Sequence, residues 1–499
     1  MIWNKTNSSN AIPRNTAASN LEFPLLKFSD DKNDWWTVRN ALEGTQIFGG
    51  IGSGKTSGSG RMIATSFLKN GFGGVILCAK PDEAEEWKKY AYECGREKDL
   101  ILFSEGSEWR FNPLQYEITR GGKGAGLTMN ITELFMSVFK MGQRITGSSS
   151  EEKERFWENS MKRCVNRIVD LLKLSGEELS IYNMVELLSC APKDDITLQK
   201  INELDDDEII KWGESDFCVK CLYKAGENAK TPQQDRDFNL VFNYFLRDFA
   251  TLDEKVRSTV KEMFLGFCEP FLTGILNDHF AQDTNLTPEA TFEGKIIVLD
   301  FAVKDYLVAG IYAQSIFKYL FQQAVERRKI SPDTLPVFLW VDESQYFVNE
   351  YDTIFQTTAR SSRACTVFLT QNISNYYAQM GGGESVAKVD SLLGNLSTKI
   401  FHCNNDSVTN EWASKVIGHN FLTLESDSTS KVNFSIADST TGQSYSIQIL
   451  PQVLPVEFTT LAQGGEFFQF KTQAIVTVKG KKWSDGKNYK KAVFAQFQK

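Results

Sequence analysis

The sequence predicts an α/β fold in which a mainly parallel sheet is interrupted by an all-helical insert and followed by a β-rich extension. Three observations support this prediction. Short apolar strands alternate with helices between residues 45 and 105, helical periodicity replaces the alternation from about residue 124 to 290, and the alternation then returns. Strands and helices in regular succession are typical of a parallel sheet covered by helices.

The first part of the predicted core covers residues 36–123. A strand in EGTQIFGG ends at a glycine-rich loop, and SGSGRMIATSFLKNG then has the apolar spacing of a helix that stops at Gly71. GGVILCAK and DLILFSE are apolar runs of strand length, and PDEAEEWKKYAYECG between them is a helix that Pro81 opens and Gly95 closes. We expect the polar residues 1–35 to form an irregular N-terminal arm.

Three further segments follow along the chain. Residues 124–290 carry runs such as EEKERFWENSMKRCVNRIVDLLKLSG and are predicted to form an all-α insert domain. The core resumes over residues 291–420, with strands in GKIIVLDF, LPVFLWVDE, RACTVFLTQN and TKIFHCNN. Residues 421–499 alternate polar and apolar side chains, which predicts a β-rich extension of the core.

Composition narrows the class of protein. The chain has 499 residues, of which 41% are hydrophobic and 24% charged, with a formal net charge of −8. That charge argues against a globally basic nucleic-acid-binding surface, although a small basic channel stays compatible with it. The nine cysteines, an odd number, indicate reduced thiols. The sequence contains no signal peptide and no apolar run of about 18 residues, so we expect a cytoplasmic protein without a membrane span.

The glycine-rich loop fits the full P-loop (Walker A) pattern, Gly49-x-x-x-x-Gly54-Lys55-Thr56. Glycines let backbone N–H groups turn toward phosphates, Lys55 supplies charge to the β and γ phosphates, and the Thr56 hydroxyl binds Mg²⁺. The helix after the loop adds its N-terminal dipole. The predicted nucleotide-binding residues are Gly49, Gly50, Ile51, Gly52, Ser53, Gly54, Lys55, Thr56 and Ser57.

A P-loop needs an acidic partner at the end of a second strand, and two strands end in acids. KIIVLD ends in Asp300, whereas PVFLWVDE ends in the adjacent carboxylates Asp342 and Glu343. We predict that Asp342 holds Mg²⁺ as the Walker B residue and that Glu343 positions and deprotonates the attacking water. Asp300 is expected to be a polar strand end beside the site. The paired acids favour an ATPase with a RecA-like P-loop core.

Two further side chains complete the predicted catalytic set. Gln371 ends the strand in RACTVFLTQN and is expected to sense the γ-phosphate. Arg360 and Arg363 precede that strand, and an arginine finger from a neighbouring subunit stabilises charge in the transition state. From the residues alone, either arginine could serve.

The motifs together resemble the coupling ATPases of conjugation and type IV secretion, the TraD/TraG kind within the FtsK/HerA superfamily. The resemblance rests on IFGGIGSGKTSGSGR, GGVILCAKPDE, FNPL, FWENSMKRCVNRIV, TFEGKIIVLDFAV, LPVFLWVDESQYF, ARSSRACTVFLTQN and TKIFHCNNDSVTNEWASKVIG, in that order. It covers most of the chain.

The resemblance implies a homohexameric ring with ATP and Mg²⁺ at subunit interfaces, and an all-α domain that helps to select cargo. By motif position it favours Arg360 over Arg363 as the arginine acting in trans, and it places Asp406 near the nucleotide pocket. Two departures matter. Family members that dock on a secretion channel usually carry N-terminal membrane helices, which are not found here, and the family's Asp-x-Lys is replaced by Cys78-Ala79-Lys80.

Three functions stay open at this point. The first is an ATP-driven motor that moves DNA, gripped by basic loops such as residues 326–329 (ERRK) or 143–147 (QRITG). The second is an ATPase that recruits or translocates a protein partner. Such an ATPase could rely on a separate, membrane-anchored partner, or it could belong to a mobile element or a defence system. The third is a nucleotide-gated assembly module that hydrolyses little nucleotide. The Asp342–Glu343 pair argues against it, because paired acids favour hydrolysis.

Overall fold

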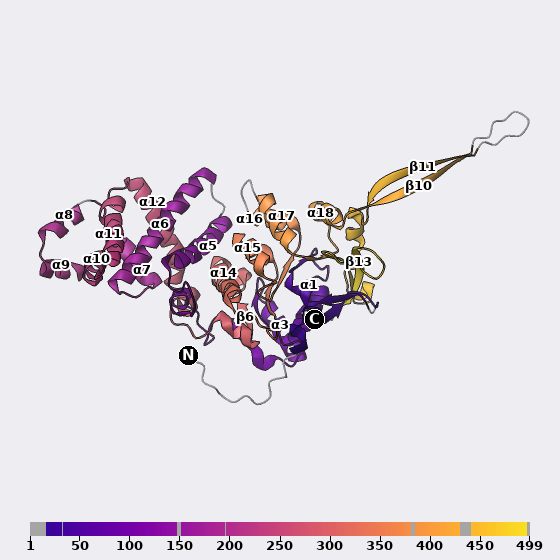
Figure 1. Cartoon of the computed structure of the whole chain (residues 1–499), viewed down its shortest axis with the longest axis horizontal. Helices are drawn as coiled ribbons and strands as arrows, with labels where there is room; N and C mark the ends of the chain where they lie inside the picture. Colours follow the sequence, from indigo (N-terminus) through magenta and orange to yellow (C-terminus); the bar gives the residue numbers. More distant parts are fainter. Residues whose placement is uncertain are drawn as a thin grey trace, which may run out of the picture.

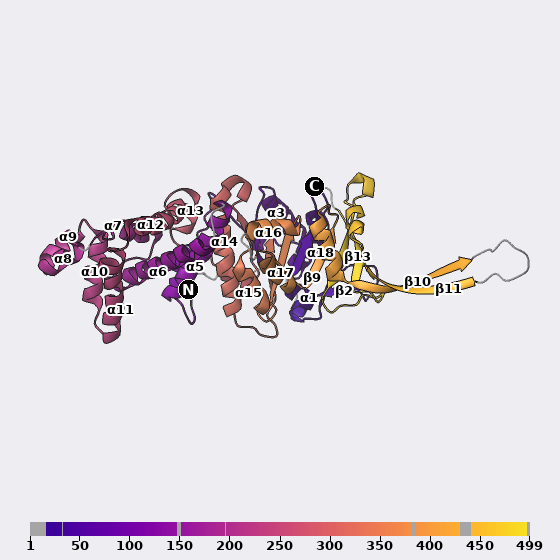
Figure 2. The ribbon, with the colours of Figure 1, turned by 90° about the horizontal axis from the view of Figure 1, so that it is seen from above.

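The chain is elongated, with a helical domain at one end, an α/β core in the middle and a β-hairpin at the other end (Figures 1 and 2). The computed structural model describes residues 16–31, 33–146, 151–194, 196–380, 385–429 and 441–496. No helix within these ranges is long and apolar enough to span a lipid bilayer.

The core is built on a nine-stranded sheet with the order β13-β12-β9-β3-β8-β7-β4-β6-β5. The seven strands from β9 to β5 in this order are parallel to one another. Strand β12 pairs antiparallel with β9, and β13 pairs antiparallel with β12. The strands are β3 (Thr45–Phe48), β4 (Gly73–Leu77), β5 (Leu100–Ser104), β6 (Ile296–Asp300), β7 (Val337–Val341), β8 (Ala364–Thr370), β9 (Thr398–His402), β12 (Lys471–Val478) and β13 (Tyr489–Ala495). The predicted mainly parallel α/β core is confirmed.

Both faces of the sheet are buried, because apolar residues follow one another along each strand. In β4, Val75 and Leu77 belong to one apolar cluster and Ile76 belongs to the other. The helices that cover the Ile76 face are α1 (Val38–Leu42), α2 (Arg61–Lys69) and α3 (Glu83–Glu93); those on the opposite face are α14 (Val303–Arg327), α15 (Glu350–Thr358), α16 (Ile373–Met380), α17 (Ser385–Asn395) and α18 (Ser407–Ile417).

The insert is helical, as predicted, and packs firmly on the core. Its apolar residues, such as Val165 and Phe264, belong to the same cluster as Leu77 and the α14 residue Phe317. After α4 (Pro113–Thr119), its helices are α5 (Thr128–Thr146), α6 (Glu151–Ser175), α7 (Ile181–Cys190), α8 (Ile196–Glu203), α9 (Asp206–Gly213), α10 (Phe217–Asn228), α11 (Pro232–Asn243), α12 (Glu254–Cys268) and α13 (Gly274–Phe280).

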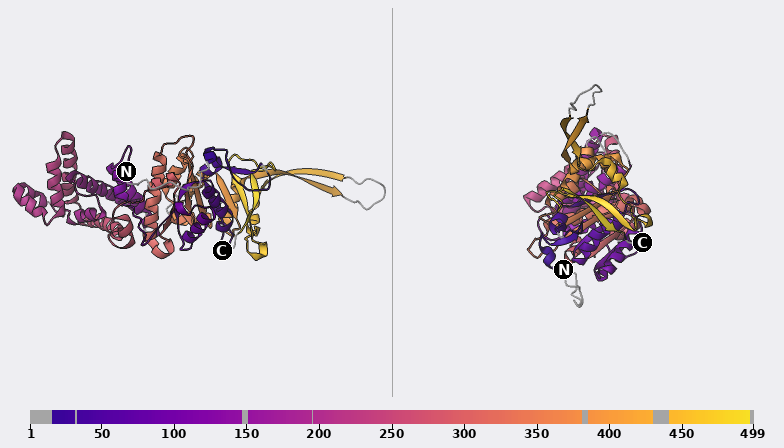
Figure 3. Two further views of the ribbon diagram at one scale, coloured as in Figure 1. Left: turned by 90° about the horizontal axis from the view of Figure 1, so that it is seen from below. Right: turned by 90° about the vertical axis from the view of Figure 1, so that its right-hand side faces the viewer.

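The C-terminal segment is β-rich, as predicted, but its four strands divide between two places. Strands β12 and β13 extend the main sheet, whereas β10 (His419–Thr429) and β11 (Thr441–Pro451) form a separate antiparallel hairpin. The hairpin projects away from the body (Figure 3). Phe421 near its base is 75% exposed, and Ile449 opposite it is 62% exposed.

The N-terminal arm differs from the prediction. Residues 1–35 were expected to be irregular, but Pro24–Lys27 forms strand β1, which pairs with β2 (Trp35–Thr37). Residues 1–15 lie outside the described part of the chain. The small sheet forms because Leu26 and Phe28 are buried together with Trp36, whose indole N–H donates to Thr398 Oγ1 at 3.0 Å. The prediction missed this sheet because its few apolar residues are surrounded in the sequence by polar ones.

Candidate active site

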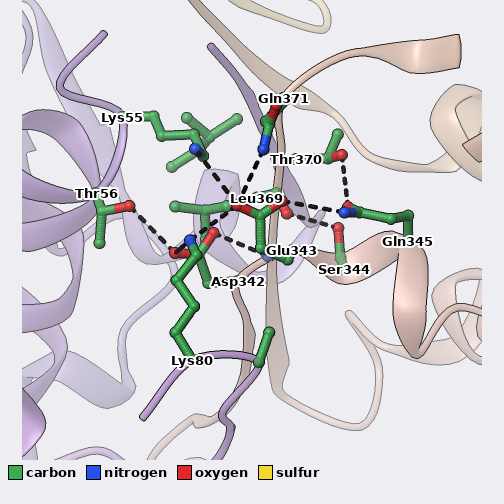
Figure 4. Close-up of polar contacts among 12 residues, drawn as sticks. Lys55, Thr56, Lys80, Asp342, Glu343, Ser344, Gln345, Leu369, Thr370 and Gln371 are labelled. Carbon is green, nitrogen blue, oxygen red and sulfur yellow. Dashed lines mark hydrogen bonds and ion pairs between the residues drawn. The ribbon is translucent and has the colours of Figure 1, made fainter. Parts of the chain in front are cut away.

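The predicted site residues other than Arg360 meet at the carboxyl edge of the sheet, where parallel strands place ligand sites. The P-loop follows β3, Asp342 and Glu343 follow β7, and Gln371 follows β8, which lies between β3 and β7. Figure 4 shows the side chains converging on Glu343. Asp300 ends β6, which β4 separates from β7, in agreement with its predicted place beside the site.

The P-loop is held by backbone hydrogen bonds from the neighbouring strands. Gly49 N–H donates to Thr370 C=O at 3.2 Å, and Gly50 N–H donates to Cys403 C=O at 2.9 Å. Gly52 and Gly54 have φ of 72° and 80°, a backbone conformation that side chains with a Cβ rarely adopt. A π-helical turn over Thr56–Gly60 then continues directly into α2. The predicted strand, loop and helix are therefore all present.

The Walker B pair has an unusual backbone. Glu343 lies in the left-handed region, with φ 43° and ψ 47°, and its N–H donates to Asp342 Oδ1 at 2.8 Å. Such strain in a residue other than glycine is typical of functional sites. Thr56 Oγ1 donates to Asp342 Oδ2 at 3.2 Å, so the two predicted Mg²⁺ ligands are adjacent.

Glu343 is surrounded by donors. Its Oε1 atom lies 2.8 Å from Lys80 Nζ, 3.9 Å from Lys55 Nζ and 3.4 Å from Gln371 Nε2. Its Oε2 atom accepts from Gln345 Nε2 at 3.0 Å. Burial alone would raise the pKa of Glu343, but the charge of Lys55 and hydrogen bonds from Lys80 and Gln345 lower it to about 2. The carboxylate is therefore ionised, and its orientation is fixed from both oxygens.

A second set of contacts fixes the segment after β7. Thr370 Oγ1 donates to Gln345 Oε1 at 2.7 Å, and Ser344 Oγ donates to Leu369 C=O at 2.8 Å. These bonds connect the segment after β7 to the end of β8, which Gln371 directly follows. A displacement of Gln371 would therefore also displace the segment that holds Glu343.

Lys80 is the site residue that sequence reasoning missed. Cys78-Ala79-Lys80 was read as a departure from a family motif, without a role for the lysine. Because β4 pairs with β7, with Leu77 opposite Val341, the residues after both strands meet. Lys80 Nζ lies 3.7 Å from Asp342 Oδ2 as well as 2.8 Å from Glu343 Oε1. A basic residue three positions beyond a strand of the core was the available signal.

Arg360 does not reach this edge within its own chain. It precedes β8, whereas Gln371 follows β8, and seven residues of strand separate the two ends by about 20 Å. The Arg360 side chain is 49% exposed and pairs with Glu43 at 3.1 Å. Arg363 is held inward, with φ 54° and a hydrogen bond to Ser19 C=O. Of the two arginines, Arg360 is the one presented at the surface.

Other sequence candidates have structural partners. In residues 326–329, Arg328 donates to Ser362 C=O at 2.7 Å and to Arg363 C=O at 2.7 Å, and therefore anchors the turn before β8. The side chains of residues 143–146, and residue 147, lie outside the described part of the chain. Asp406 caps α18 by accepting from Thr409 N–H at 2.9 Å, and it also accepts from Thr409 Oγ1 at 2.6 Å.

The residues present suit a phosphate chain with a divalent cation. Lys55 is 9% exposed in its side chain and projects into the cradle, and the Thr56 and Asp342 oxygens are the ligand type that Mg²⁺ prefers. A cavity of about 260 Å³ opens beside Glu343 and is also lined by Lys80, Gln345 and Gln371. The site therefore has open space next to Gln371, the predicted γ-phosphate sensor.

Comparison with known proteins places this geometry in context. Residues 336–461, which include the Walker B pair, Arg360 and Gln371, match the family model described as the TraM recognition site of TraD and TraG. The bacterial conjugative coupling protein TrwBdeltaN70, in an unbound monoclinic form, superposes with a TM-score of 0.58 at 13% identity, over 94% of this chain and 91% of that chain. The chain has the fold of the conjugative coupling proteins.

Two further TrwB structures superpose over nearly the same length. TrwB in complex with a non-hydrolysable ATP analogue gives a TM-score of 0.55 at 12% identity, over 92% of this chain and 87% of that chain. TrwB in complex with ADP and Mg²⁺ gives 0.54 at 12% identity, over 94% and 90%. No curated protein sequence matches the chain. The predicted resemblance to TraD/TraG-type coupling ATPases is therefore confirmed by the family model and by the fold.

Proposed function

We propose that the chain is a Mg²⁺-dependent ATPase of the coupling-protein type, which works as a homohexameric ring and moves or recruits DNA or nucleoprotein cargo. The observation that carries ATP hydrolysis is the convergence of Lys55, Thr56, Asp342, Glu343 and Gln371 at one edge of the sheet. TrwB, which shares this fold, is found with an ATP analogue, with a GTP analogue and with ADP and Mg²⁺, which supports a purine nucleotide with Mg²⁺ as the ligand.

Each residue has a defined task in this proposal. Lys55 binds the β and γ phosphates, and Thr56 and Asp342 hold Mg²⁺, which supplies charge neutralisation when bound. Once Lys55 bonds to phosphate it leaves Glu343, which then orients the attacking water and accepts its proton. Gln371, at hydrogen-bond distance from Glu343, reports on the γ-phosphate.

The position of Arg360 supports the proposed ring. Because Arg360 lies at the opposite edge of the sheet from its own P-loop, it can contribute to hydrolysis only in a neighbouring subunit. Mass photometry with and without nucleotide tests the assembly. A strict monomer under both conditions, at high protein concentration, would leave Arg360 without a role.

The ATPase proposal is tested with Glu343→Gln. Removing the general base is expected to lower kcat by about 100-fold or more, while nucleotide binding persists. Binding is followed with a fluorescent ADP analogue. An unchanged kcat in the variant would show that the assignment of the base is wrong.

DNA as cargo is tested by measuring turnover without nucleic acid, with single-stranded DNA and with duplex DNA, at low and moderate salt. Grip through phosphates predicts a stimulation that fades as salt rises. Turnover that ignores DNA would instead favour recruitment or translocation of a protein partner. The net charge of −8 and the engagement of Arg328 by backbone carbonyls favour that second candidate.

A further inference from the structure

The ammonium group of Lys80 bridges the two Walker B carboxylates. Its Nζ atom lies 2.8 Å from Glu343 Oε1 and 3.7 Å from Asp342 Oδ2. The two acidic side chains are only 6% and 5% exposed, whereas the Lys80 side chain is 29% exposed. Lys80 thus enters from the open side of the site, and the acids are fixed within it.

Two adjacent buried carboxylates are costly unless a cation compensates them. Lys55 lies 3.9 Å from Glu343 and has no ion pair with Asp342 among the contacts of the described residues. Lys80 is therefore the cation that contacts both acids.

The oxygen of Asp342 that faces Lys80 is also the one that accepts from Thr56. Asp342 Oδ2 lies 3.2 Å from Thr56 Oγ1 and 3.7 Å from Lys80 Nζ. Thr56 and Asp342 are the two residues assigned to Mg²⁺ above. The ammonium group therefore lies beside the pair of oxygen-bearing side chains that would hold the divalent cation.

We propose that Lys80 is a positioning residue that neutralises Asp342 in the nucleotide-free site, yields Asp342 to the divalent cation, and keeps its bond to Glu343. The proposal rests on the ATPase function proposed above. The cavity beside Glu343, which Lys80 also lines, gives the side chain room to move off Asp342 without leaving Glu343. Lys80 then holds Glu343 after Lys55 has turned to the phosphates.

The first test needs no turnover. Wild type, Lys80→Met and Lys304→Met are titrated with Mn²⁺ alone, and free Mn²⁺ is measured by electron paramagnetic resonance. Lys304 is a matched control, because it lines the same cavity and is exposed, and its described contact is a backbone bond to Ala79 C=O at 3.3 Å. Removing a cation that competes with the metal is expected to tighten Mn²⁺ binding by about 5-fold or more in Lys80→Met only. Unchanged or weaker Mn²⁺ binding in Lys80→Met would overturn the proposal.

The second test separates positioning from a merely structural ion pair. Lys80→Met is expected to lower kcat by about 10-fold or more with KM for ATP within about 3-fold of wild type, because the lost contact acts on the base and not on the nucleotide. Lys80→Arg is expected to recover part of kcat. A higher KM with unchanged kcat would overturn the positioning role. If the wild type itself does not hydrolyse ATP, the proposed function fails, while the Mn²⁺ titration still judges the competition at Asp342.

Discussion

Thr56 Oγ1 and Asp342 Oδ2 lie 3.2 Å apart, although 286 residues separate them in the sequence. The helical insert accounts for most of that separation and lies at one end of the molecule, away from the hairpin. The contact exists because β3 and β7 are parallel strands on either side of β8, so that the segments following them emerge at the same edge.

Asp342→Asn is expected to weaken the Mg²⁺-dependent part of ADP binding by about 10-fold or more and to lower kcat by about 100-fold or more, because the charged metal ligand is lost. ADP binding is measured by calorimetry with Mg²⁺ and with a chelator. Asp300→Asn, which changes the strand end two strands away, serves as the control and should stay within about 2-fold. Equal effects of the two substitutions would contradict the Walker B assignment.

Arg360→Ala is expected to lower kcat by about 1,000-fold, within the range measured for arginine fingers. The decisive measurement mixes Arg360→Ala subunits with Lys55→Ala subunits, each inactive alone. Interfaces between an intact P-loop of the first and an intact arginine of the second should restore turnover. Mixed rings that stay inactive would argue against action in trans.

The buried pair Lys318–Asp352 connects α14 to the segment that follows Glu343. Both side chains are 0% exposed, Lys318 Nζ lies 2.6 Å from Asp352 Oδ2, and it also donates to Phe347 C=O at 2.6 Å. Lys318→Met should lower the free energy of unfolding by about 3–5 kcal/mol, since a charge is left buried without its partner.

Urea denaturation measures this effect. The matched control is Lys388→Met, which breaks a partly exposed ion pair with Glu350 and should cost less than about 1 kcal/mol. The double variant Lys318→Met/Asp352→Asn should recover a substantial part of the loss, because no uncompensated charge remains. Equal losses of unfolding free energy for Lys318→Met and Lys388→Met would show that burial does not determine how much an ion pair contributes to stability.

His402, which is buried next to the P-loop, is expected to make the free energy of unfolding depend on pH. Its ring is fully buried and lies 2.7 Å from Ser59 Oγ through Nε2. Burial, and next the charge of Lys55, lower the pKa of His402 from 6.5 to about 3. Below pH 6.5 the unfolded chain binds a proton that the folded chain does not, so this contribution to stability falls as pH falls toward 3.

The expected size of the effect is about 2 kcal/mol between pH 7.5 and pH 5. It is measured as the difference in urea unfolding free energy between wild type and His402→Asn at both pH values, which removes the contribution of all other groups. The variant should lose less stability than the wild type over this interval. A parallel loss in both proteins would mean that His402 is protonated in the folded state.

The elements of the core were predictable because each carries a local signal. The signals are apolar runs of strand length, the glycines of the loop and the Asp342–Glu343 pair at a strand end, and each of them spans only a few consecutive residues. The strand β1 was not predicted, because it is short and depends on Trp36, whose partner Thr398 is distant in the chain.

Residue types and motif order thus determined, by themselves, the α/β class, the helical insert, the phosphate cradle and the acids that face it. Only the tertiary structure decided that Lys80 shares that site and that Arg360 does not. The pairing of β4 with β7 brings Lys80 onto Glu343, and the length of β8 sets Arg360 at the opposite edge from its own P-loop. Strand order is a global property of the sheet, because strands that are neighbours in it, such as β4 and β7, are distant in the sequence.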